Sequence, residues 1–247
     1  STFTNALTAN ANNDVVSAVG VTVNTGTLTV TADNDTSSVG AISGAGTLTA
    51  TTIDLNAATG ISANTTATTV TADNSTSGNV SVTDTDGLAI SGSNADGGSF
   101  TAIAGASNTL TVGGSNISAG TGTVTLQADE MTLTGTVTAN GGVTLLRNTA
   151  GNISLGAGGG LDLSDATLDQ ISTTGTLTIG SIGGNNTNIT VDSAISRATG
   201  NLSLAADADI TFQQGATTGL TTTGATTVTI NAGDQIINQA TVATDIN

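Results

Sequence analysis

Carboxylates are the only side chains in this sequence that could carry out acid–base or nucleophilic chemistry. The chain has 18 acidic residues and two arginines, with no His, Cys, Lys or Tyr, so the common general bases and activated nucleophiles are missing. Two carboxylates separated by one residue share a face of a strand, and paired carboxylates can hydrolyse glycosidic bonds. The candidates are Asp84 with Asp86, Asp207 with Asp209, Asp129 with Glu130, and Asp162 with Asp165 and Asp169.

The same carboxylates are also typical of turns between strands. Asp86 precedes Gly87, and the other acidic residues flank expected turns. Asp favours such positions because its side chain can hydrogen-bond the local backbone. The sequence therefore favours a turn role and predicts that the chain is not an enzyme. A carboxylate-dependent polysaccharide hydrolase or lyase is the third functional alternative.

Calcium is the metal for which ligands exist, because hard cations take carboxylate and amide oxygens. The segments around Asp33 and Asp35, and around Asp84 and Asp86, resemble the start of a calcium loop. Neither continues with the remaining acidic ligands of such a loop. We expect no cofactor and no specific metal site, although an acidic surface can bind calcium diffusely.

A short repeat runs through the whole chain and must position these residues. Thr-x-Thr with a central aliphatic residue recurs, and Thr29–Asn34 returns unchanged as Thr69–Asn74, 40 residues later. Half of this period, about 20 residues, separates the central residues Leu28, Leu48, Val70, Ile90 and Leu110. A fixed period of this size indicates one stacked supersecondary unit. Alternating apolar and β-branched polar residues identify that unit as a strand.

The fold predicted from this repeat is all-β, a right-handed parallel β-helix, or β-solenoid. At about 20 residues a coil the chain makes roughly 12 coils, and a strand spacing of about 4.8 Å gives a rod of roughly 60 Å. With only three Phe, the core must consist of Val, Ile, Leu and Ala. No linker divides the chain, so residues 1–247 are expected to form one domain. The segment 158–171 breaks the rhythm and predicts a turn or short helical excursion.

The net charge of −16 limits the possible partners. Nucleic-acid binding requires a basic surface, and anionic lipids are disfavoured for the same reason. No apolar window approaches the length of a membrane span. The chain starts at Ser1 without an apolar leader, so we expect a processed chain or an excised piece.

The two ends of the expected solenoid carry no evident cap. They have no amphipathic helix, no Pro and no edge-blocking Lys, so their unpaired backbone groups could template another chain. The segments of about 1–24 and 231–247 are therefore candidate inter-subunit strands, and head-to-tail stacking would give an open filament. The expected apolar anchors are Phe3, Leu7, Ile237 and Val242. Alternatively, these ends fray or continue into a larger chain.

Several segments resemble the repeats of filamentous-haemagglutinin-like bacterial exoproteins. They are Gly122–Leu126, Gly151–Leu155, Gly200–Leu204, and the pair Leu161–Ala166 and Leu168–Ile171. The resemblance implies a secreted right-handed parallel β-helix that forms an adhesive or structural shaft. The Asn-Pro motif of that family's secretion domain is absent from this Pro-free chain, so the likeness is to the shaft repeats.

The function expected from these features is structural. We expect a shaft or subunit of a secreted bacterial filament, for adhesion, biofilm or matrix, whose partners are further copies of itself. The alternative is a solenoid that binds surface glycans or ice through arrays of Thr hydroxyls. Thr pairs at steps of about ten as well as 20 predict hydroxyls spread over several faces, which favours the structural interpretation.

Overall fold

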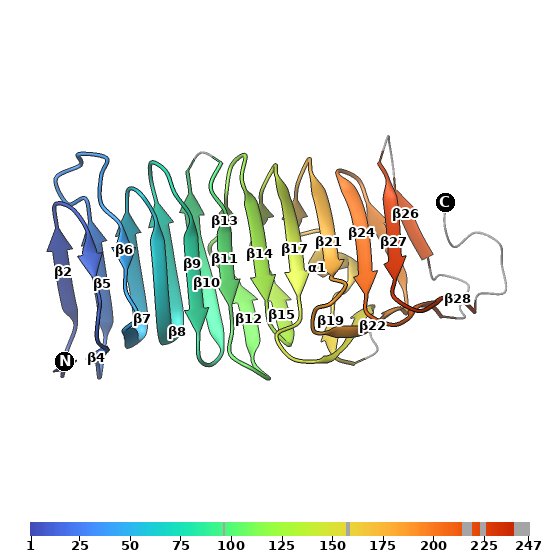
Figure 1. Ribbon diagram of the computed structural model, residues 1–247, viewed down its shortest axis with the longest axis horizontal. Coiled ribbons are helices and arrows are strands. Elements are labelled where there is room, and N and C mark those ends of the chain that lie inside the picture. The colour runs from blue at the N-terminus through green and yellow to red at the C-terminus, as the bar shows by residue number, and fades with distance from the viewer. Residues whose placement is uncertain (96, 157–158, 214–218, 223–225, 240–247) are drawn as a thin grey trace.

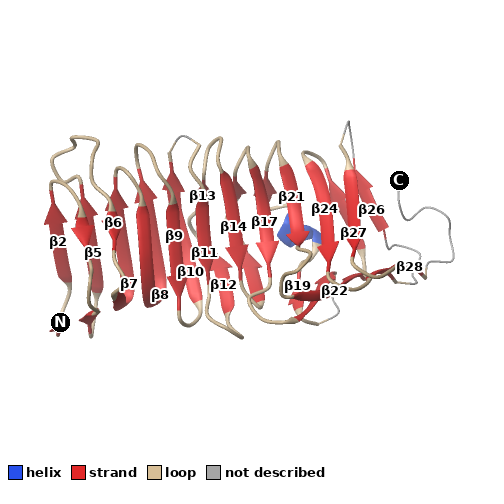
Figure 2. Ribbon diagram, in the orientation of Figure 1, coloured by secondary structure: helices blue, strands red, loops and turns tan. Residues whose placement is uncertain are grey.

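The protein is an elongated rod of stacked β-coils (Figure 1). The computed structural model describes residues 1–95, 97–156, 159–213, 219–222 and 226–239. Strands make up 56% of the residues and helix 2%, and parallel stacked sheets form a β-solenoid (Figure 2). The predicted all-β solenoid is thus confirmed, while the hand of the coil stays a prediction. About 10 turns are present, fewer than the 12 expected, because several coils exceed 20 residues.

The first coils contain two or three strands each. In chain order they are β1 (Thr2–Phe3), β2 (Leu7–Ala11), β3 (Val15–Val16), β4 (Val21–Val23), β5 (Thr27–Ala32), β6 (Ile42–Ser43), β7 (Thr47–Ala57), β8 (Ile61–Asn74), β9 (Val80–Asp84) and β10 (Leu88–Asn94). The middle coils contain β11 (Phe100–Ile103), β12 (Thr109–Val112), β13 (Ile117–Ser118), β14 (Thr123–Gln127), β15 (Glu130–Leu133), β16 (Val137–Thr138), β17 (Gly142–Leu146), β18 (Gly151–Leu155), β19 (Leu161–Asp162), α1 (Asp165–Leu168) and β20 (Ile171–Ser172).

The last coils add a further sheet, in which β19, β18, β22, β25 and β28 lie side by side. Their elements are β21 (Thr176–Gly180), β22 (Asn186–Val191), β23 (Ala194–Arg197), β24 (Asn201–Ala206), β25 (Ile210–Phe212), β26 (Gly219–Thr222), β27 (Val228–Ala232) and β28 (Ile236–Asn238). No helix in the described residues is long and apolar enough to cross a membrane.

The register differs from the one that the sequence spacing suggests. Leu28 lies beside Ile53, which lies beside Val70. Leu48 instead pairs with Val21 and Thr65, and Leu110 pairs with Leu88 and not with Ile90, so the residues spaced by about 20 positions do not all stack on one another. Since β7 is long enough to bend across a corner, it contributes residues to two columns. Spacing alone selected the wrong residue of that strand.

The exact copies of Thr29–Asn34 are two residues out of register. Val30 stacks on Leu55 and then on Ala72, not on Val70. A shift of two residues keeps every inward side chain inward, because strand side chains alternate with period two. The repeat therefore preserves burial without preserving identity at each position.

Aliphatic side chains fill the interior from one end to the other. A single cluster of buried residues runs from Val23 to Leu220, and the largest fully buried side chains include Phe100 and Phe212. Strand β5 shows the rule, since its Leu28, Val30 and Ala32 are buried while the Thr residues between them are half-buried. Each large aliphatic side chain buried in this way contributes about 1.5–3 kcal/mol.

Asparagines tie the corners of adjacent coils together. Asn74 Nδ2 donates to Asn94 Oδ1 over 2.7 Å, and both residues are buried. Other Asn side chains accept the first amide of the next coil, at 2.9 Å from Ser99 N to Asn79 Oδ1 and at 2.9 Å from Thr136 N to Asn116 Oδ1. These bonds satisfy corner backbone groups that turns would otherwise leave unpaired.

The irregular segment around 158–171 forms an excursion that includes a short helix, as predicted. Ser164 caps α1 by accepting from Thr167 N. Arg197 of β23 is 4% exposed and donates to the Leu168 and Ile171 carbonyl oxygens. Burial lowers the pKa of this guanidinium, and the charges of Asp169 and Asp165 oppose that shift. Arg197 therefore fastens the excursion to the following coil.

Candidate functional site

Asp84 and Asp86 are brought together at the corner that follows β9, as their spacing predicts. Asp84 is buried and accepts hydrogen bonds from Thr65 Oγ1, Ala67 N and Asp86 N. These three bonds make Asp84 part of the corner itself. Asp86 is exposed beside it.

The proximity of the two carboxyl groups changes the acidity of Asp86. A hydrogen bond to the Asp84 side chain raises the pKa of Asp86 to about 6, with further increases from burial and from the Asp84 charge. A carboxyl group that holds its proton at mildly acidic pH can serve as a general acid. Asp84 is occupied by its three donors, so the pair lacks a free second carboxylate.

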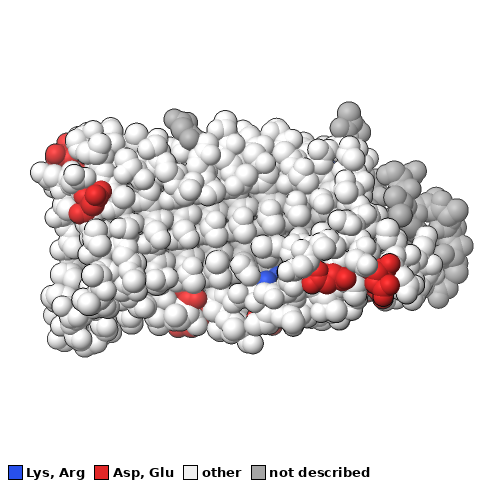
Figure 3. Space-filling model, viewed as in Figure 1, with Lys and Arg blue, Asp and Glu red and all other residues white. Residues whose placement is uncertain are grey.

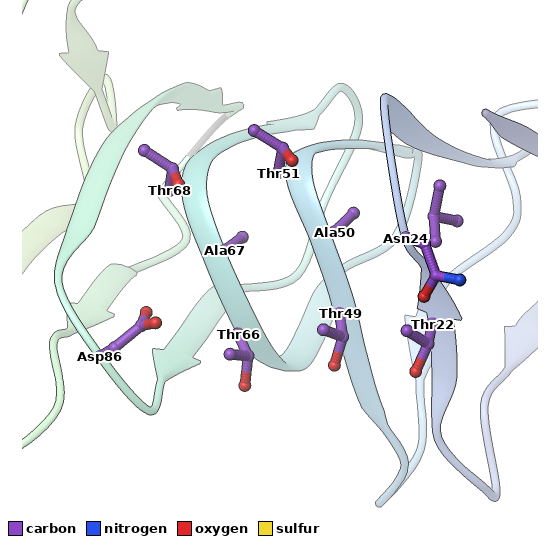
Figure 4. Close-up of a pocket in the computed structure, with 10 residues that line it drawn as sticks. Thr22, Asn24, Thr49, Ala50, Thr51, Thr66, Ala67, Thr68 and Asp86 are labelled. Atoms are coloured by element: carbon purple, nitrogen blue, oxygen red, sulfur yellow. The ribbon is translucent and has the colours of Figure 1, made fainter. Parts of the chain in front are cut away.

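Asp86 lies at the end of a shallow groove lined mainly by threonines. Figure 4 shows Thr22, Thr49 and Thr66 in a row from three successive coils, and Asp86 beyond them. The groove has a volume of about 290 Å³ and is open to solvent. Thr66 Oγ1 and Thr85 Oγ1 are 2.6 Å apart. The groove offers hydroxyl groups and one carboxyl group to a ligand, but no walls that would exclude water.

The second candidate calcium pair lies in a different coil. Asp33 has a φ of 72° and accepts hydrogen bonds from the Ser37 hydroxyl and the Ser38 amide. Asp35 accepts from the Ser37 amide. Both side chains thus stabilise their own turn. Within the described residues, no three His, Cys, Asp or Glu side chains are grouped to hold a metal ion.

Asp129 forms a buried ion pair that the sequence did not reveal. Its Oδ1 lies 3.1 Å from Arg147 Nη2, and it accepts from the Ser107 and Thr149 amides. Partial burial acts to raise the pKa of Asp129, but these amides and the Arg147 charge outweigh it and keep the pKa below the usual value. Its sequence neighbour Glu130 is exposed and accepts from Thr109 Oγ1. The two carboxylates therefore have separate roles.

Three of the remaining acidic candidates accept hydrogen bonds from backbone amides. Asp207 accepts from Gly183 N, Asp165 from Ser196 N and Asp162 from Gly159 N. Asp169 is the C-terminal cap of α1 through its backbone. Asp209, the other member of the pair with Asp207, keeps one carboxylate oxygen buried without a hydrogen-bond partner among the described residues.

The N-terminal end of the solenoid presents unpaired strands and incompletely buried apolar residues. In the described chain, β1, β2 and β3 each pair with one strand only, namely β4, β5 and β6. Phe3 is 39% exposed, and Leu7 is only partly buried. A cavity of about 130 Å³ in the first coils is lined mainly by aliphatic side chains, Leu7 among them. Val16 and Val19 are 64% and 70% exposed.

The last described coil shows the same incomplete burial. Strands β26, β27 and β28 each have one partner among the described strands. Val228, Ile230 and Ala232 are only partly buried against the core. Ile237 is half-buried in β28, and Val242 lies outside the described residues. Core positions thus lose part of their cover at both ends of the described rod.

Comparisons with known proteins add no relative. No family model, curated protein or solved structure matches this chain.

The features that sequence reasoning missed are those that depend on register. The Asn74–Asn94 bond joins residues 20 positions apart, and Arg147 reaches Asp129 across one coil boundary. Both arginines of the sequence are buried, and their isolation in an acidic chain was the available signal. Their partners follow only once coils of unequal length are aligned.

Proposed function

We propose that this chain is a structural subunit of a secreted bacterial extracellular filament, in which copies stack end to end. The observation that carries the proposal is the partial burial of core residues in the first and last described coils. Stacking the last coil of one copy on the first coil of the next would bury these side chains. Apolar burial of this kind stabilises association by roughly 25 cal/mol per Å².

The strands exposed at the two ends belong to the same series of paired strands, which we call a column, so they are compatible with such a junction. One continuous column begins at β3 and passes through β6, β8, β9, β11, β14, β17, β21 and β24 to β27. β27 of one copy and β3 of the next would therefore meet as neighbouring strands of the same sheet. This contact repeats without closing, as a filament requires.

The filament role is consistent with a chain in which most of the candidate carboxylates accept hydrogen bonds at the corners between strands. It includes no catalytic step and no dedicated cofactor, and its partners are further copies, with surface glycans as possible additional contacts. The extracellular location and the role in adhesion, biofilm or matrix rest on the likeness to filamentous-haemagglutinin-like shafts. Repulsion between negatively charged copies opposes stacking, so assembly should strengthen as salt screens that repulsion.

Asn10 lies in β2, which precedes β3 in the same N-terminal coil and pairs only with β5 among the described strands. Asn10→Pro therefore tests stacking at this end of the rod with little change to the fold. The Ala11 carbonyl accepts from Asn34 N in the second coil. Backbone groups of successive residues in a strand point to opposite sides, so the Asn10 amide points away from the rod. Proline removes that amide and blocks strand addition at an edge. The matched control is Asn10→Ala.

We expect the unaltered chain and Asn10→Ala to form filaments visible by electron microscopy and large species by light scattering. Asn10→Pro should shift both measurements toward the monomer, with an unchanged β-sheet circular dichroism spectrum. If the unaltered chain is a monomer at all salt concentrations, the filament proposal is wrong.

A further inference from the structure

One face of the rod carries a hydroxyl group on every coil over eight successive strands. We call this set the hydroxyl row. Each member pairs with the next in the parallel register, without a break. The members are Ser62, Ser81, Thr101, Thr125, Thr144, Thr178, Ser203 and Thr229. Hydroxyls occupy other faces too, as the sequence predicted, but here they follow a spacing of one per coil.

Within the part of the chain that the structure describes, the hydroxyls of this row do not bond to one another or to other protein groups. This holds for the side-chain oxygens of Thr101, Thr125, Thr144 and Thr178 at the centre of the row. These side chains are half-buried. Because Thr is branched at Cβ, its χ1 angle is restricted, which limits the positions that these unbonded oxygens can take.

The face is uncharged although the chain carries a net charge of −16. Strands β11, β14, β17, β21, β24 and β27 contain no Asp, Glu, Lys or Arg. Figure 3 shows a flat, uncharged area over β14, β17, β21 and β24, with side chains in rows along the rod. No aromatic side chain is exposed there, since Phe100 of β11 points inward and is fully buried.

The Thr-rich face formed by β7 and β8 differs from the hydroxyl-row face in its charge and in its internal hydrogen bonds. Its outward residues include Asp54 and Asp73, which lie in register with Thr71 and Asn56. Asp73 accepts from the Ser93 hydroxyl, and Thr71 lies within 3.4 Å of the Ser91 hydroxyl. The β7–β8 face is thus charged and its hydroxyls bond to protein groups, whereas the hydroxyls of the hydroxyl-row face do not.

We infer that the hydroxyl-row face binds the surface of an ice crystal, a function separate from end-to-end stacking. Its hydroxyls repeat at about 4.8 Å along the rod. In β14 and β21 a second Thr, Thr123 or Thr176, lies about 6.8 Å from the row member of the same strand, while Gly142 and Asn201 occupy that position in β17 and β24. These spacings are in the size range of the oxygen repeats on ice planes. Each hydroxyl can replace one water of the lattice as donor and acceptor.

Rigidity and methyl groups favour ordered water over a sugar chain. Immobilising a bridging water has an entropic cost, and a rigid array of hydroxyls offers one fixed geometry to many waters at once. Thr methyl groups between the hydroxyls, together with Ile103 and Leu146 on the same strands, provide apolar contact. A polysaccharide would gain more from exposed aromatic rings or a deep groove, which the described face lacks.

Thermal hysteresis of the purified full chain tests the inference directly. We expect a measurable gap between freezing and melting points and faceted ice crystals. Thr144→Lys places a long charged side chain in the centre of the row and should reduce the hysteresis at least tenfold. The matched control is Thr132→Lys, because Thr132 also points outward from a strand, β15, but lies on another face.

A second variant guards against loss of fold. Thr125→Val with Thr144→Val and Thr178→Val keeps the shape and β-branching but removes three hydroxyls, and hysteresis should fall severalfold with an unchanged circular dichroism spectrum. Absence of hysteresis in the unaltered chain overturns the inference, whether or not the chain binds an insoluble neutral polysaccharide or a second copy through this face. Equal hysteresis in Thr144→Lys and Thr132→Lys overturns it as well.

Discussion

Removal of the Asp129 carboxylate should destabilise the middle of the rod more than any neighbouring surface substitution. Asp129 and Arg147 have side chains only 7% and 9% exposed, and their charged atoms are 3.1 Å apart. In Asp129→Ala, Arg147 loses its counter-charge and the Ser107 and Thr149 amides lose their acceptor. Breaking a buried pair by removing one partner costs about 3–5 kcal/mol. Because the pair borders an open depression, water can reach it, and we expect about 3 kcal/mol.

The measurement is urea unfolding followed by circular dichroism, with Glu130→Ala as the matched control. Glu130 is exposed, so its removal should change the free energy of unfolding by less than about 0.5 kcal/mol. The double variant Asp129→Ala with Arg147→Met should recover part of the loss, since it no longer buries an unpaired charge. Equal unfolding free energies for Asp129→Ala and Glu130→Ala would refute the assigned role of the ion pair.

Three further outcomes follow from the structure. The pKa of Asp86 is raised to about 6, so the folded chain binds this proton more tightly than the unfolded chain, and the Asp86 contribution to stability should increase as pH falls through 6 toward 4. The difference in urea midpoint between the unaltered chain and Asp86→Asn should therefore vary over that pH range. A constant difference contradicts the assignment. The lowered pKa of Asp129 acts oppositely, so its stabilisation should be present at neutral pH and be lost in acid, as an Asp129→Asn comparison in acid unfolding would reveal. Gly92→Ala should lower the free energy of unfolding by several kcal/mol, because a Cβ there would lie 2.0 Å from the Ala72 carbonyl oxygen. The control Gly114→Ala is also at positive φ but has open space around it, so it should lower that free energy by only about 1 kcal/mol. Equal thermal shifts for the two variants would exclude the clash as the cause.

The sequence was sufficient for the architecture because burial depends only on alternation. Val30 and Val70 are both buried even though they do not stack on each other, so the period predicted the strand class without the correct register. Gly92 illustrates what was hidden. It lies where β10 changes partner from β12 to β13, a break that no count of Thr-x-Thr spacing contains.

The candidate sites were only partly accessible from the sequence. Spacing correctly placed Asp84 beside Asp86, since residues i and i+2 of one strand share a face. The hydroxyl row was not visible, because Thr144 and Thr178 are adjacent in the sheet but separated in sequence by the excursion that contains α1. Loops of unequal length conceal a register that is regular in space.

The coil geometry also determines how the rod would respond to a pulling force. Hydrogen bonds between neighbouring strands lie along the long axis, so tension on the two ends acts on successive coil boundaries in series. β7 and β8 pair along most of their length, whereas β16 with β20 and β3 with β6 pair through two residues each. Coil boundaries with few paired residues should separate before those with many. A stretched rod would then lengthen one boundary at a time, while the remaining coils stay folded.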